Sequence, residues 1–153
     1  MKQISIYSLA VNILSILLLL GNTIYLIVVW NSLPDQIPGH YDFAGNVTRY
    51  DGKGSLLAVP IINVILFLSM SLVERFPQIW NTGVRVTEEN KVRVYLILKN
   101  MLVTIKLSIV IAFVYLSINQ TLESGLTGWF MGIFLFLIFA PTVFFGVKLI
   151  KAR

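Results

Sequence analysis

The chain has 153 residues, a formal net charge of +5 and no cysteine. Hydrophobic residues make up 57% of the chain and charged residues only 12%, against roughly 25% charged residues in average soluble domains. This is more apolar surface than one small water-soluble core could bury. The absence of cysteine excludes disulfides and thiol chemistry.

Long uncharged runs predict four membrane-spanning helices. A helix needs roughly 20 apolar residues to cross a bilayer. The first and last runs exceed this length, the run at 56–73 is near the lower limit, and the run after Leu107 reaches it only if the preceding segment with two lysines is included. We predict an all-α membrane protein, with one membrane domain over residues 1–153 and helices at about 4–30, 55–74, 93–118 and 125–148. The first apolar run is longer than the roughly 7–15-residue core of a cleaved signal peptide, so we expect it to remain as an anchor.

Lysine and arginine are unevenly distributed between the loops, and this bias sets the orientation of a membrane protein. They occur beside both termini and in the segment 75–92, whereas the loop 33–54 has more acidic than basic residues. We therefore expect cytoplasmic termini, a cytoplasmic loop at 75–92 and an extracytoplasmic loop at 33–54. The net positive charge then belongs to the cytoplasmic rim, beside anionic lipid, and indicates no nucleic-acid partner.

The first loop, 33–54, is polar and strongly patterned. Pro34 and Pro38 favour extended backbone, and Ala44–Gly45–Asn46 separates two short segments of strand-forming residues. A glycine-containing turn between such segments is typical of a hairpin. We predict an ordered cap at 33–54 that could form a short β-hairpin.

The only histidine of the chain, His40, lies in this loop. Together with Asp35, Asp42 and Asp51 it could bind a divalent cation, but the spacing matches no established ligand pattern. The favoured interpretation is a structural histidine that bonds within the loop, and a third is sensing of external pH. We predict no metal and no cofactor.

The later helices carry signals of their own. Ser55 is predicted to cap the second helix, and Pro60 falls in its first turns, where proline is tolerated. Thr87 is a candidate N-cap for the third helix. Gly125, Gly128 and Gly132 open the fourth predicted helix with a spacing that allows close helix packing.

Lys106 lies near the middle of the third predicted helix, where a lysine costs about 2.5–3.5 kcal/mol on insertion scales. Lys99 is closer to the cytoplasmic surface. Either both side chains snorkel or reach a water-filled crevice, or Lys106 faces the bundle and pairs with polar groups such as Asn12, Asn22 or Asn63. No acidic residue is expected at mid-membrane depth to neutralise it. We expect Lys106→Leu to insert normally but to impair function.

Catalytic signatures are missing from the sequence. It has no metalloprotease H-E-x-x-H pair, no P-loop and no G-x-S-x-G nucleophile elbow. We therefore expect that the protein is not an enzyme.

The segment W-N-S-L-P-D-Q-I-P-G-H-Y-D-F-A-G-N-V-T-R-Y, residues 30–50, resembles the bacterial integral membrane domain of unknown function numbered 1648, as found at the N-terminus of SdpI-type immunity proteins. The later segment 76–90 also resembles small members of that family. With Asp35, the matching positions form our candidate ligand-binding or structural motif. The matching positions are Leu33, Pro34, Ile37, Pro38, His40, Tyr41, Asp42 and Gly45.

The resemblance implies a role at a bacterial cytoplasmic membrane, in protection against a secreted membrane-active peptide or as a receptor that holds a repressor there. SdpI-type proteins have more membrane spans than this chain. Our leading hypothesis is a non-enzymatic protein that recognises an extracytoplasmic ligand such as an antimicrobial peptide at 33–54, with a cytoplasmic regulator at 75–92. The alternatives are a small transporter or permeability factor, which would need to form a homo-oligomer, and an accessory subunit of a membrane complex.

Overall fold

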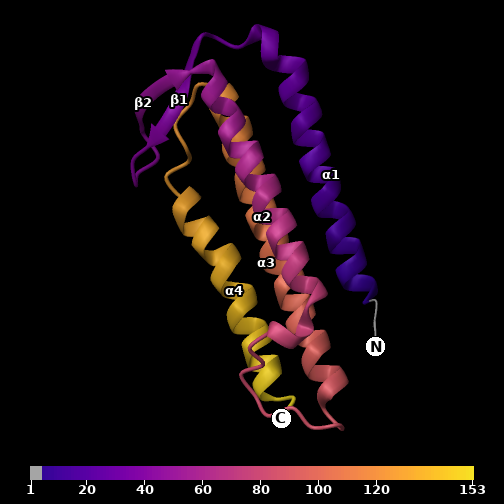
Figure 1. Cartoon of the computed structure of the whole chain (residues 1–153). Helices are drawn as coiled ribbons and strands as arrows, with labels where there is room; N and C mark the ends of the chain where they lie inside the picture. The colour runs from indigo at the N-terminus through magenta and orange to yellow at the C-terminus, as the bar shows by residue number, and fades with distance from the viewer. Residues whose placement is uncertain (1–4) are drawn as a thin grey trace.

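The structure, a computed structural model, describes residues 5–153 (Figure 1). Within this range, four helices are long and apolar enough to cross a membrane, and a two-stranded antiparallel hairpin connects the first two helices. The predicted fold class is therefore confirmed, hairpin included. The helices and strands are α1 (Ile6–Val29), β1 (Gln36–Tyr41), β2 (Val47–Gly52), α2 (Ala58–Arg75), α3 (Lys91–Thr121) and α4 (Phe130–Ile150).

The hairpin lies at one end of the bundle, and the first turn of α1 and the C-terminus lie at the other (Figure 1). We call these the hairpin end and the terminal end. The outer three helices, α1, α2 and α4, surround α3, which supplies most of the buried helical positions. The outer helices expose large apolar side chains on their outward faces, as at Val28 of α1 (74% exposed) and Phe136 of α4 (68%). Because these helices leave so much hydrocarbon uncovered, they fit a multi-pass protein in a lipid bilayer.

The starts of the first two helices differ from the predicted boundaries. Ile4, the predicted start of the first helix, lies outside the described residues. The second helix begins at Ala58 rather than at residue 55, because Lys53–Leu57 form a 3₁₀-helix, η2. The prediction that Ser55 caps the second helix is therefore wrong, because the N-cap residue of α2 is Leu57. Pro60 lies in the first turn of α2, where its missing N–H removes no helical bond.

The start of α3 is held by two side chains that cap each other's backbone. The Thr87 hydroxyl accepts a bond from the Asn90 N–H (3.3 Å), and the Asn90 side-chain oxygen accepts one from the Thr87 N–H (2.8 Å). The Thr87 carbonyl accepts from the Lys91 N–H at 2.9 Å. The helical ladder thus starts from Thr87, although Asn90 is the N-cap residue of α3.

The fourth helix begins at Phe130, five residues later than predicted, because the preceding residues form a loop that contacts the hairpin. Gly125 and Gly128 consequently precede the helix, and Gly132 faces open space. The prediction that these glycines bring helices close together is wrong.

The segment after α2 folds back against the terminal end of the bundle. A 3₁₀-helix, η3 (Pro77–Ile79), follows α2, and the Trp80 indole N–H then donates to the Val73 carbonyl at 2.8 Å. Beyond it, apolar side chains of this segment pack against the start of α3 and the end of α4. The cluster comprises Val94, Leu98, Leu149 and Ala152, with Trp80, Val84, Val86, Ile97 and Met101 around them.

Candidate functional site

The hairpin is anchored by apolar residues of the motif. Leu33 and Ile37 are buried together with Leu26 of α1 and Leu56 of η2, and Ile37 is completely shielded. Pro34, between them, is half-buried. Each fully buried side chain of this size contributes about 1.5–3 kcal/mol through the hydrophobic effect. The two apolar motif positions therefore fix the base of the hairpin onto α1 and η2.

Lys53 closes the base of the hairpin. Its backbone N–H donates to the Asp35 carbonyl at 2.8 Å, and its ammonium donates to the Leu33 carbonyl at 3.2 Å. The same ammonium lies 5.2 Å from the centroid of the Trp30 ring, within the range of a cation–π contact. The motif residue Asp35 thus helps to close the base of the hairpin with its backbone carbonyl.

Pro38 connects the hairpin to the central helix. It is buried, and its carbonyl accepts a bond from the Gln120 side-chain amide of α3 at 3.0 Å. The next residue, Gly39, makes a bulge in β1, where the strand pairing shifts. A Cβ atom at Gly39 would lie 2.1 Å from an Asp51 carboxylate oxygen. Sequence reasoning missed Gly39 and Gln120. Gly39 stands at an unspecified motif position, and Gln120 is a polar residue near the end of an apolar helix.

Asp42 shapes the turn between the strands. Its two carboxylate oxygens accept bonds from the backbone N–H (2.8 Å) and the side-chain amide (2.9 Å) of Asn46. The Asn46 amide is the main reason that the pKa of Asp42 lies below its usual value. Asp42 is therefore ionised at neutral pH and holds the turn as an acceptor.

Gly45, at the tip of the turn, joins the hairpin to the loop before α4. Its φ of 90° is one that glycine adopts at little cost. The Gly45 carbonyl accepts a bond from the Leu126 N–H at 2.7 Å. A Cβ atom at Gly45 would lie only 2.5 Å from the Leu126 carbonyl oxygen. The motif glycine is thus required both by its own backbone and by the neighbouring loop.

His40 is exposed and bonds across the hairpin. Its Nδ1 lies 2.7 Å from the Thr48 hydroxyl, on the opposite strand. Asp51 pairs with Arg49 at 2.9 Å. Among residues 5–153, no group of three or more histidines and carboxylates is placed to hold a metal ion. The contact with Thr48 fits the structural interpretation of His40, a histidine that bonds within the loop.

Tyr41 is half-buried at the end of β1. Burial raises the pKa of its hydroxyl, and the neighbouring Asn119 offsets part of that shift. The hydroxyl is therefore protonated at neutral pH. All the motif residues thus lie in the hairpin or directly before it, and most of them contribute to its packing or its hydrogen bonds.

A second polar site lies inside the bundle, around Lys106. This side chain is only 1% exposed, and its ammonium pairs with the carboxylate of Glu74 in the last turn of α2. It also donates to the Ser71 hydroxyl at 3.0 Å and lies 4.7 Å from the centroid of the Phe67 ring. Lys106 therefore faces the bundle, where an acidic partner satisfies its charge. Lys99, one of the sequence candidates, is half-buried nearer the start of α3.

The partners predicted for Lys106 need correction. Asn12 donates to the second carboxylate oxygen of Glu74 at 3.3 Å, so it reaches the lysine only through that carboxylate. Asn63 donates instead to the Val110 carbonyl of α3, also at 3.3 Å.

Asn22 is buried in α1, and its side-chain oxygen has no hydrogen-bond partner within residues 5–153.

The expectation that no acidic residue would neutralise Lys106 is wrong, because Glu74 pairs with it. Glu74 is the last residue of the predicted second helix, far in sequence from Lys106. Lysine side chains in helices point toward the helix N-terminus, which for Lys106 is the direction of Glu74.

Comparison with known proteins places the hairpin at the centre of a recognised domain. Residues 17–64 match the family described as a domain of unknown function, DUF1648. This range runs from α1 through the whole hairpin into the first turns of α2, and it confirms the resemblance to that domain. The segment 76–90 lies outside the match. No curated protein and no solved structure matches the chain.

We predict that Gly45→Ala destabilises the hairpin by about 1–3 kcal/mol, the usual cost of a residue held in an unfavourable backbone conformation. Thermal unfolding in detergent should show a lower midpoint. Gly54→Ala is the matched control, because a Cβ atom there would meet no other atom within 4 Å. Equal midpoints for both variants would contradict the role assigned to Gly45.

We predict that Lys106→Leu and Glu74→Leu each destabilise the bundle by about 3–5 kcal/mol, since each leaves a buried charge without its main partner. The double variant should recover much of this loss, which a double-mutant cycle of unfolding free energies measures. Lys91→Met is the control, because its ion pair with Glu88 is exposed and contributes little. Additive single effects would show that the two groups are not coupled.

Proposed function

We propose that the protein is a non-enzymatic receptor in a bacterial cytoplasmic membrane, and that its hairpin recognises an extracytoplasmic peptide. The observation that carries this proposal is the asymmetry of the hairpin. Strand β1 buries Ile37 and Pro38 against the bundle, whereas β2 is exposed along most of its length. A rigid strand held outward by a helical bundle suits binding better than it suits mere connection.

The exposed strand offers a specific mode of recognition. In the part of the chain that the structure describes, β2 pairs only with β1, so its other edge carries unpaired backbone groups. An extended peptide can add to such an edge through main-chain hydrogen bonds. Tyr50 on β2 and Phe43 at the turn (81% exposed) supply aromatic side chains beside it. Both features suit a short amphipathic peptide.

The distribution of charge supports an outward-facing hairpin. The terminal end of the bundle carries most of the basic residues, and such residues favour the cytoplasmic side of a membrane. The resemblance to SdpI-type proteins supports an antimicrobial peptide as the ligand, with protection of the producing cell as the outcome. The segment 75–92 would then offer a surface to a cytoplasmic regulator. The basic residues of the terminal end are Arg75, Arg85, Lys91, Arg93, Lys148, Lys151 and Arg153.

The proposed orientation can be tested with single cysteines, because the chain has none of its own. In intact cells, a membrane-impermeant thiol reagent should label Thr48→Cys on β2. It should label Lys151→Cys at the terminal end only after the membrane is permeabilised. The reverse pattern would place the hairpin in the cytoplasm and overturn the proposed function.

The proposed recognition can be tested by survival of a sensitive bacterium against a panel of membrane-active peptides. Expression of the protein should raise the dose that inhibits growth for at least one of them. Phe43→Ala and Tyr50→Ala should lower that protection and weaken binding of the same fluorescent-labelled peptide. Ile6→Ala is the matched control, an exposed apolar residue at the terminal end and outside the segment 75–92. Unchanged survival across the panel would rule out the immunity role.

A further inference from the structure

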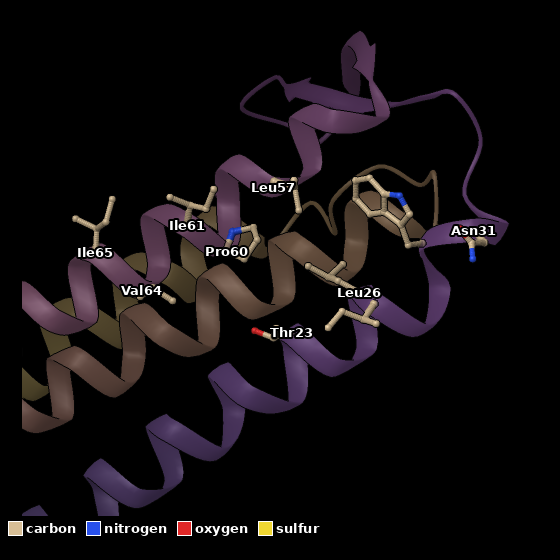
Figure 2. Close-up of a pocket in the computed structure, with 10 residues that line it drawn as sticks. Thr23, Leu26, Asn31, Leu57, Pro60, Ile61, Val64 and Ile65 are labelled. Atoms are coloured by element: carbon tan, nitrogen blue, oxygen red, sulfur yellow. The ribbon is translucent and has the colours of Figure 1, made fainter.

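A groove runs between α1 and α2 at the hairpin end of the bundle. Its volume is about 680 Å³, and its walls are almost entirely apolar. Figure 2 shows Leu26 on α1, Leu57 at the end of η2, and Pro60 and Val64 on α2 among the side chains that line it. The groove is open at the surface, where Ile27 (70% exposed) borders it.

The surroundings of the groove require an apolar occupant. The exposed hydrocarbon of α1 and α2 places the groove within the membrane, where an empty space forfeits dispersion contacts along its whole lining. Water would find few polar partners on these walls. An acyl chain of the surrounding lipid has both the chemistry and the access to fill it.

The Lys53 side chain places a positive charge next to the groove. The Lys53 ammonium lies over the ring of Trp30, which is itself a groove residue, and Lys53 begins η2, which ends at the groove residue Leu57. An ammonium has three donors, and Leu33 accepts only one of them. The contact with Asp35 is made by the backbone, and the carboxylate of Asp51 is paired with Arg49. The ammonium can therefore bond an anion from outside the chain.

We infer that this groove binds one glycerophospholipid from the leaflet at the hairpin end, with an acyl chain between α1 and α2 and the phosphate on the Lys53 ammonium. The order of polarity, an amphipathic indole and a cation above an apolar groove, matches that of a phospholipid. A membrane helix of a second copy would bring apolar side chains along its length and leave the ammonium without a counter-charge.

This site is separate from the peptide-binding edge proposed for β2, and it would bind lipid whether or not that proposal holds. The groove also coincides with the region that matches DUF1648, because nine of the ten residues that line the groove fall within residues 17–64. The matched region thus contains the hairpin and nearly all of the groove beneath it.

Native mass spectrometry of the detergent-purified protein with added phosphatidylglycerol tests the inference. One lipid should bind per chain, and a diacylglycerol with the same acyl chains but no phosphate should bind much more weakly. Lys53→Gln should weaken phosphatidylglycerol binding by about tenfold, through loss of a charge-assisted hydrogen bond. Lys151→Gln, at the terminal end, should leave it unchanged. Equal affinity for both lipids, or equal affinity of both variants, would overturn the site.

A second variant tests the groove without touching the charge. Val64→Trp fills the groove and should abolish the single-lipid adduct, whereas Ile133→Trp, a lipid-exposed residue of α4, should keep it. Thermal unfolding of each variant checks that the fold is intact. Retained lipid binding in Val64→Trp would refute the groove as the site. A dimer of the parent chain that Val64→Trp dissociates would show that a second copy, not a lipid, occupies it.

Discussion

Polar side chains of α3 attach α1, α2 and the hairpin to the central helix. In hydrocarbon, helices gain little from the hydrophobic effect on packing together, so hydrogen bonds and close contacts select their arrangement. Near the terminal end, Lys106 binds Glu74 of α2. At the hairpin end, Gln120 binds the carbonyl of Pro38. The central helix thus fixes α2 and the hairpin to one scaffold.

Helix α1 is attached to the same scaffold by similar means. The Tyr7 and Thr104 hydroxyls lie 2.7 Å apart near the terminal end, and those of Tyr25 and Thr121 lie 2.7 Å apart near the hairpin end. These contacts hold α1 to α3 at two depths. A groove can therefore remain between α1 and α2 while both helices keep their positions.

The hairpin depends on this scaffold for its existence. An isolated two-stranded hairpin is marginally stable at best in water. Here its base packs on Leu26 and Leu56, its first strand bonds Gln120, and its tip bonds Leu126. Most residues of the sequence motif maintain these attachments and the turn itself. The motif therefore records how the hairpin is held, while the side chains that it presents outward lie largely outside the motif.

The sequence predicted the features that follow from local patterns. Uncharged runs predicted the four helices, and the glycine turn after His40 predicted the hairpin, because hydrophobicity and turn chemistry act over neighbouring residues. The pairing of Lys106 with Glu74 could not be predicted in this way, since it depends on how far α3 extends past the end of α2. The late start of α4 likewise depends on a contact between Leu126 and Gly45, which are distant in sequence. Such contacts between distant elements carry no local signal.

The bond from Gln120 to Pro38 joins residues that are 82 positions apart, and this separation has a consequence for biogenesis. Ribosomes add roughly 5–20 residues per second, so about 4–16 s pass between synthesis of the two partners. During that time the first two helices can already be in the membrane with their connecting strands undocked. Until the third helix and the loop before the fourth arrive, the nascent hairpin has only its base contacts with Leu26 and Leu56 and lacks those with Gln120 and Leu126. Its short strands and bulge limit wrong pairing with other chains during this interval.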